Sequence, residues 1–122
     1  MSNHHTIQYV ELSVGDVARA KRFYAEAFGW GFNDYGPDYA GIRSDDGSGE
    51  VGGLAGGRTG EDPVAAGGVL VLVQSDDVDD TARAVQDAGG VLEGDVYAYP
   101  GGRRFTFTAP DGNRLGAFQP EG

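Results

Sequence analysis

The distribution of apolar and polar residues divides the chain into two similar halves. In the first half the segment YVELSV (residues 9–14) alternates between apolar and polar positions, as in a strand with one buried face. In the second half VLVLVQ (residues 69–74) is an apolar run of strand length. Each segment leads into an Asp-Val pair, at Asp16 and at Asp77, and these pairs lie 61 residues apart in a chain of 122 residues. The repetition predicts an internal duplication.

Each Asp-Val pair also begins a predicted helix. An aspartate at this position can accept hydrogen bonds from the backbone N–H groups of the first turn. Glycines follow at the expected ends, Gly29 and Gly89. The first helix has apolar residues at helical spacing, and we expect this face to pack against a sheet. The face comprises Val17, Ala20, Phe23, Ala27 and Phe28.

Short strand-like segments follow each helix, so that each half reads strand, helix and then three strands. The turn APDGN (residues 109–113) has the proline and glycine that favour a connection between two antiparallel strands. The stretch TGEDPVAAG (residues 59–67) has the composition of a linker. We therefore predict a single domain over residues 1–122, with module one at about 6–57, a linker at about 58–67 and module two at about 68–120. The strand-like segments are 30–35, 39–43 and 50–55 in the first half, and 91–99, 103–109 and 113–119 in the second.

The amino-acid composition excludes some classes of function and favours others. The chain has 9 Lys and Arg against 19 Asp and Glu, a formal net charge of -10. Such an acidic surface repels nucleic acid and favours cationic small molecules. The absence of cysteine excludes disulfides, thiolate metal sites and cysteine nucleophiles. No apolar run approaches the ~18 residues that would span a bilayer, so we expect no membrane partner and a cytoplasmic location.

The 22 glycines produce two motif matches that lack the required context. GSGEVG (residues 47–52) fits the dinucleotide-binding pattern, and GGLAGGRT (residues 52–59) nearly fits the phosphate-binding loop. Both motifs need a following helix whose N-terminus holds the phosphate. The segment after them is too short and irregular for a helix, and Glu50 would repel a phosphate. We therefore do not expect nucleotide binding.

The two halves, the helix entry VGDVARAKRFYAEAFGW and the late segment APDGNRLGAFQ together resemble the glyoxalase / bleomycin-resistance / extradiol dioxygenase (vicinal oxygen chelate) superfamily. The resemblance covers nearly the whole chain. It implies an α+β fold in which two βαβββ modules form a curved mixed sheet around a concave cleft, with the helices on the convex side. It also implies a homodimer, since proteins of this fold with two modules commonly pair.

In metal-dependent members of that superfamily, a His or Glu lies on the first strand of a half and another on its last strand. The resemblance places these positions at Tyr9 and Leu70 on the first strands and at Gly116 on the second half's last strand. None is a metal ligand, and a zinc or iron site needs three or four converging donors. His5 comes four residues too early, roughly 13 Å along a strand. We therefore predict no metal and no cofactor, and we expect His4 and His5 to lie in a frayed terminus.

Strand alternation indicates the candidate ligand-binding residues. In the first strand Val10 and Leu12 face one way, and Tyr9 and Glu11 face the other. We expect the apolar pair to meet the helix and the second pair to face the cleft. The same alternation in the other strands, together with the tyrosines after the first helix, completes the candidate set. The set is Tyr9, Glu11, Tyr35, Tyr39, Leu70, Leu72, Gln74, Arg114 and Phe118.

Glu11 has two interpretations. Buried among aromatic residues, it could have a raised pKa and act as a general base, which makes it the candidate catalytic residue. Alternatively it forms a structural ion pair with Arg43, Arg104 or Arg114. The aromatic residues are open to similar alternatives, because they serve equally as core, dimer contact or ligand platform.

Three hypotheses about function follow. The first is a metal-free protein that binds a small, partly aromatic molecule, such as a drug-sequestering resistance factor. The second is a metal-independent enzyme of the same fold that uses Glu11 or a tyrosine. The third is a metal-dependent lyase or dioxygenase whose ligands lie at positions other than those aligned above. The fold alone does not decide between binding and catalysis.

Overall fold

The computed structural model describes residues 3–47, 49–56, 68–99 and 101–121, and the predicted linker at 58–67 lies outside the described residues. These ranges contain two helices and nine strands, which confirms the α+β class. The chain separates into two compact units, one of residues 9–70 and the other of residues 1–8 with 71–122. None of the described helices is both long and apolar enough to cross a membrane.

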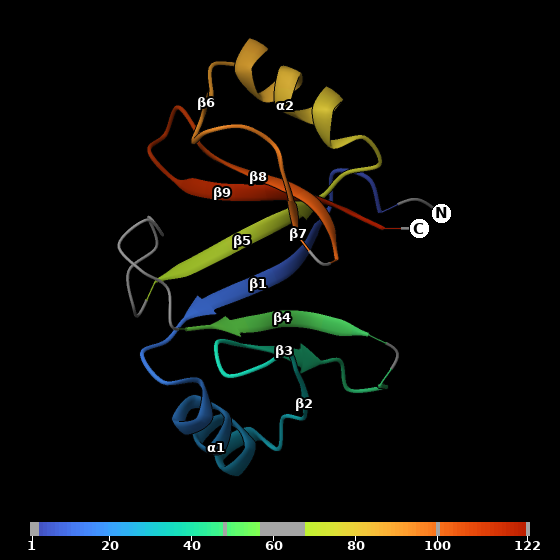
Figure 1. Ribbon diagram of the computed structural model, residues 1–122. Coiled ribbons are helices and arrows are strands. Elements are labelled where there is room, and N and C mark those ends of the chain that lie inside the picture. Colours follow the sequence, from blue (N-terminus) through green and yellow to red (C-terminus); the bar gives the residue numbers. More distant parts are fainter. Residues whose placement is uncertain (1–2, 48, 57–67, 100, 122) are drawn as a thin grey trace. The chain divides into compact units, whose positions relative to one another are not determined.

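The unit of residues 9–70 is built around one helix and four strands (Figure 1). The strands lie in the order β2-β3-β4-β1, with β1 parallel to β4 and the other neighbours antiparallel. Asp16 begins the helix as predicted, because its Oδ1 accepts the Arg19 backbone N–H at 3.1 Å. Gly29 ends it with a φ of 73°, which favours glycine. The elements are β1 (Ile7–Ser13), α1 (Val17–Phe28), β2 (Phe32–Asp34), β3 (Tyr39–Arg43) and β4 (Glu50–Ala55).

The second unit repeats this plan. Its strands lie in the order β5-β9-β8-β6, with β5 parallel to β9, and β7 also pairs with β8. The predicted strand at 91–99 is two shorter strands, β6 and β7, and the predicted turn joins β8 to β9. The repeat places two pairs of residues at equivalent positions. They are Glu11–Gly53 in β1 and β4 and Leu72–Gly116 in β5 and β9. The elements are β5 (Val69–Gln74), α2 (Val78–Asp87), β6 (Val91–Leu92), β7 (Tyr97–Tyr99), β8 (Gly102–Thr108) and β9 (Arg114–Pro120).

One prediction about α1 is wrong. Phe23 and Phe28 were expected to face the sheet, but they are 57% and 62% exposed. The side chains instead join an aromatic cluster at the end of the helix, in which Tyr24 stacks on Trp30 with ring centroids 4.9 Å apart. Val17 is the buried residue of this helix. Contacts among aromatic rings that are close in the sequence therefore stabilise these side chains without burial against the sheet.

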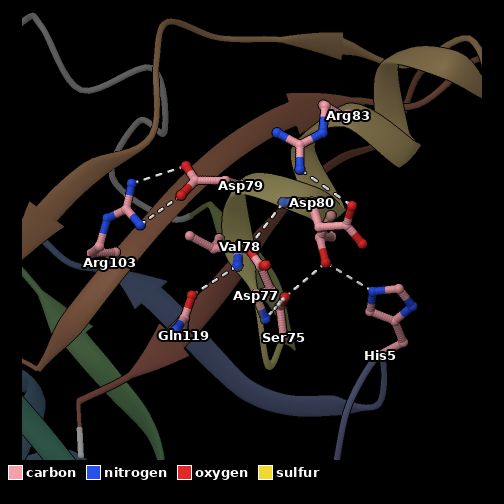
Figure 2. A network of polar contacts seen from close by, with 10 residues as sticks. His5, Ser75, Asp77, Val78, Asp79, Asp80, Arg83, Arg103 and Gln119 are labelled. Carbon is pink, nitrogen blue, oxygen red and sulfur yellow. Dashed lines mark hydrogen bonds and ion pairs between the residues drawn. The ribbon is translucent and has the colours of Figure 1, made fainter.

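The residues before β1 are attached to the second unit. The His5 backbone N–H donates to the Gln74 carbonyl at 2.7 Å, and His5 Nε2 lies 2.8 Å from Thr81 Oγ1 (Figure 2). His4 Nδ1 accepts the Asp76 backbone N–H at 2.9 Å. The expectation of a frayed terminus at both histidines is therefore wrong, because main-chain pairing with the end of β5 orders this segment.

The start of α2 is also tied to the neighbouring strands. Gln119 Oε1 in β9 accepts the Val78 backbone N–H at 2.8 Å, which satisfies one of the N–H groups that the helix itself leaves unpaired. Arg103 in β8 donates two hydrogen bonds to the Asp79 carboxylate, both at 2.9 Å (Figure 2). This paired arginine holds the pKa of Asp79 below its usual range.

Candidate ligand-binding face

The sheet of the unit of residues 9–70 has one face that carries two adjacent glycines. Glu11 in β1 pairs with Gly53 in β4, which pairs with Gly41 in β3, which pairs with Asn33 in β2. Side chains of paired residues point to the same side of a sheet, so these four positions form one row. We call this side the glycine face. It is opposite α1, because Gly56, an odd number of residues after Gly53, faces the other side, and a Cβ there would meet Val17 of that helix at 2.8 Å.

The glycine face carries a continuous hydrogen-bonded chain of three side chains. Tyr39 Oη donates to Glu11 Oε2 at 3.0 Å, and the hydroxyls of Tyr39 and Tyr9 lie 2.7 Å apart. Glu11 is 4% exposed. The space above Gly53 admits the two phenols, since a Cβ there would lie 2.0 Å from Tyr39 Oη and 2.7 Å from Tyr9 Oη. The glycine is therefore required by the side chains that cross it. We call these three residues the Tyr9–Tyr39–Glu11 chain.

Burial raises the pKa of both phenols in this chain. For Tyr9 desolvation is the main cause, reinforced by the charges of Glu50 and Glu11. For Tyr39 desolvation again comes first, followed by the Glu11 charge. Both groups therefore remain protonated at neutral pH and can donate one hydrogen bond each.

A second carboxylate, Glu50, lies further along the same face. It accepts hydrogen bonds from Asn33 Nδ2, at 2.9 Å, and from Tyr35 Oη. That bond with Glu50 is the main reason that the pKa of Tyr35 is raised. Its carboxylate fills the space above Gly41, where a Cβ would lie 2.3 Å from the Glu50 carboxyl carbon. The rings of Tyr35 and Tyr39 are 6.2 Å apart, so the face presents two tyrosine rings beside its carboxylates.

Glu50 was missing from the predicted set. A register shift between Ile42 and Arg43 allows Glu50 to pair with Arg43 and to lie over the glycine face. Strand alternation from the sequence cannot anticipate such a bulge. Gly41 in β3 was the available signal, because glycine inside a strand often marks close approach of another group, and the Glu50 carboxylate lies above this glycine.

The predicted residues of the second unit lie on the sheet face opposite α2. Leu72 pairs with Gly116, and Gln74 pairs with Phe118. The adjacent position, Ala117, belongs instead to the core under α2. Leu70, which is 2% exposed, belongs to the unit of residues 9–70.

Arg114 is held by a carboxylate of its own unit. Its Nε donates to Glu93 Oε1 at 2.7 Å, and Glu93 also accepts from Thr106 and Thr108. On the same strand as the two threonines, the buried Arg104 guanidinium lies about 6 Å from the rings of Tyr97 and Tyr99. Glu93 was not identified from the sequence, and Arg104 was considered there only as an ion-pair partner of Glu11.

The positions that the resemblance assigns to metal ligands do not fit a transition-metal ion. Tyr9 is a protonated phenol engaged with Tyr39, and Leu70 has no donor atom. At Gly116 a Cβ would lie 2.6 Å from Leu72 Cδ2, so the space for a ligand side chain is already filled. Among the residues that the structure describes, no group of three or more His, Cys, Asp or Glu could hold a metal ion. The metal-free state of the purified protein stays a prediction.

Solved structures similar to this chain share its fold. A Legionella pneumophila structure described as an NAD-dependent benzaldehyde dehydrogenase has 22% identity and a TM-score of 0.71, with 93% of this chain and 98% of that chain covered. The Mn(II)-bound glyoxalase from Novosphingobium aromaticivorans has 25% identity and a TM-score of 0.67, with 98% of this chain but only 40% of that chain covered. Streptomyces coelicolor methylmalonyl-CoA epimerase has 18% identity and a TM-score of 0.71, with 99% and 100% covered.

The sequence itself gives a family match. No curated protein matches the chain in sequence. The family model "Glyoxalase/Bleomycin resistance protein/Dioxygenase superfamily" matches residues 6–116, which is most of the chain. The duplicated plan of the two units, with the first strand of each parallel to its last, agrees with the fold that the resemblance implied. The chain belongs to the glyoxalase / bleomycin-resistance / dioxygenase superfamily.

Proposed function

We propose that the protein binds a small, partly aromatic molecule on the glycine face without a metal ion. The observation that carries the proposal is the Tyr9–Tyr39–Glu11 chain, in which a carboxylate that is 4% exposed is connected to two phenols. Binding sites for small molecules commonly combine aromatic walls with a few placed polar groups. The tyrosine rings supply the first component, and the connected hydroxyls supply the second.

Two further features support this proposal. The glycines at 41 and 53 leave no side chain of their own over the centre of the sheet, so the functional groups of Tyr39 and Glu50 occupy that space. The net charge of -10 favours a ligand that is neutral or cationic. We further propose that the protein acts as a cytoplasmic homodimer, in line with the family.

Catalysis is the second candidate function. Glu11 is buried and accepts a hydrogen bond from Tyr39, which is an arrangement suited to a general base. Such an enzyme would be metal-independent. The third hypothesis, a metal-dependent lyase or dioxygenase with ligands at other positions, finds no supporting group of donors among the residues that the structure describes.

The proposal is tested by calorimetry against a panel of aromatic metabolites and cationic antibiotics. Replacing a well-buried aromatic contact costs ~1–3 kcal/mol, so Tyr9→Ala should weaken binding by roughly tenfold to a hundredfold. Glu11→Gln should weaken cationic ligands more than neutral ones. Tyr24→Ala is the matched control, because Tyr24 stacks on Trp30 in the cluster at the end of α1. If ligands bind and Tyr9→Ala has no more effect than Tyr24→Ala, the site lies elsewhere.

A further inference from the structure

The hydrogen bonds of the Tyr9–Tyr39–Glu11 chain have a fixed direction. Each phenol has one proton to donate. Tyr39 donates its proton to Glu11 Oε2, at 3.0 Å. In the 2.7 Å contact between the two phenols, Tyr39 must then be the acceptor and Tyr9 the donor. With its proton committed, Tyr9 can act toward any further group only as an acceptor.

We propose that this directional chain makes the glycine face select ligands that present an O–H or N–H donor to Tyr9. The inference rests on the proposed function and specifies its ligand class: phenols, alcohols and protonated or neutral amines that are attached to a flat apolar body. An ether, a carbonyl or a phenolate at the same position would bring two acceptor oxygens together. The selectivity is therefore set by Glu11, which does not itself need to touch the ligand.

The rest of the face is consistent with that direction. On the other side of the two glycines, Glu50 accepts from both Asn33 and Tyr35. The pKa of each phenol in the chain is raised, so the protons stay on the tyrosines and the direction is maintained at neutral pH. A ligand binds less tightly when it leaves a buried polar group of the protein without a hydrogen-bond partner. Two ligands that differ by one hydrogen atom can therefore differ in affinity.

Replacement of Glu11 by glutamine should reverse the chain. A glutamine side chain can donate through its amide N–H₂, which a carboxylate cannot do. In Glu11→Gln the amide can donate to Tyr39, Tyr39 can then donate to Tyr9, and Tyr9 can donate to the ligand. The variant has nearly the same shape as the wild type but the opposite hydrogen-bond direction. A structural ion pair at Glu11 would predict a loss of stability and no change in ligand preference.

The experiment uses 4-nitrophenol and its methyl ether, 4-nitroanisole, as probes of nearly the same shape. Binding to the protein is measured by calorimetry below the pKa of 4-nitrophenol, where this probe is neutral. The wild type should bind the phenol roughly tenfold more tightly than the ether, the value of about one hydrogen bond. Glu11→Gln should bind the ether as tightly as the phenol or more tightly. Tyr9→Phe should remove the preference, and the control Tyr24→Phe should retain it.

The outcomes separate the inference from the proposed function. If the wild type binds both probes equally while Tyr9→Ala abolishes binding, the directional chain is refuted and the binding site stands. If the preference survives in Tyr9→Phe, the donor is recognised by another group and the inference is again refuted. If neither probe binds, the proposed function fails and the inference fails with it. Should Glu11→Gln be unfolded by circular dichroism, the comparison of wild type with Tyr9→Phe decides the matter alone.

Discussion

Replacing Gly53 by alanine should disrupt the Tyr9–Tyr39–Glu11 chain without removing any of its polar groups. The added Cβ would lie 2.0 Å from Tyr39 Oη and 2.7 Å from Tyr9 Oη, much closer than van der Waals contact. Both hydroxyls must therefore move, and a shift of about 1 Å is enough to break a hydrogen bond at this length. The substitution acts on the two phenols at the same time.

The magnitude follows from the bonds that are lost. A hydrogen bond to a carboxylate contributes about 1.5–3 kcal/mol, and one between neutral hydroxyls contributes about 0.5–1.5 kcal/mol. Alanine also makes the unfolded chain less flexible than glycine does, which stabilises the folded state by about 0.4–1 kcal/mol. We expect the free energy of unfolding to fall by roughly 1–4 kcal/mol, since buried polar groups that lose partners are costly.

Urea denaturation followed by circular dichroism measures this change. Gly15→Ala is the matched control, because a Cβ at Gly15 would meet nothing within 4 Å. That variant should be as stable as the wild type or slightly more stable. The reasoning is refuted if Gly53→Ala and Gly15→Ala have the same free energy of unfolding within about 0.5 kcal/mol, which is the usual spread for neutral surface substitutions.

The pKa of Tyr39 is raised in the folded state, so its contribution to stability is complete below about pH 10. Above that pH the contribution is lost at up to about 1.4 kcal/mol per pH unit, and Tyr39→Phe should reduce this slope in alkaline denaturation. The pKa of Asp79 is lowered, so Asp79→Asn should reduce the melting temperature at neutral pH, and its difference from the wild type should vanish as acid protonates the aspartate below about pH 4. Elemental analysis should find no stoichiometric Zn, Fe, Ni or Mn. Light scattering at micromolar concentration should give the mass of a dimer, and a monomeric mass would contradict that proposal.

Local patterns in the sequence predicted much of the fold. The two Asp-Val pairs fixed both helix starts, since an aspartate N-cap depends only on its own turn. Strand alternation placed Tyr9 and Glu11 on the same face because the two-residue period of a strand is rigid. These features involve residues close together in the sequence, where geometry leaves few alternatives.

The contacts that form the site could not be predicted from local patterns, because they join residues that are far apart in the sequence. The bond from Tyr39 to Glu11 depends on the register of β3 against β4, and the position of Glu50 depends on a bulge in that register. The predicted orientation of α1 was wrong because Phe23 and Phe28 pack edge to face against one another at the helix end. Likewise, His5 is ordered by pairing with Gln74, which lies far along the chain. The partners in pairings of this kind cannot be identified from one segment of the sequence alone.

The filled space at Gly116 bears on the history of the protein. The residue is buried in β9, and Leu72 Cδ2 occupies the place where a side chain would begin, with the Phe105 carbonyl oxygen 3.2 Å away. A mutation that brought a carboxylate to position 116 would meet an obstructing leucine, so Leu72 would have to move or be replaced by a smaller residue first. At the equivalent pair Glu11–Gly53, the obstruction comes from two tyrosines instead. In each half, then, the order of substitutions matters, because a ligand side chain at position 53 or 116 fits only after the obstructing residues have moved or been replaced.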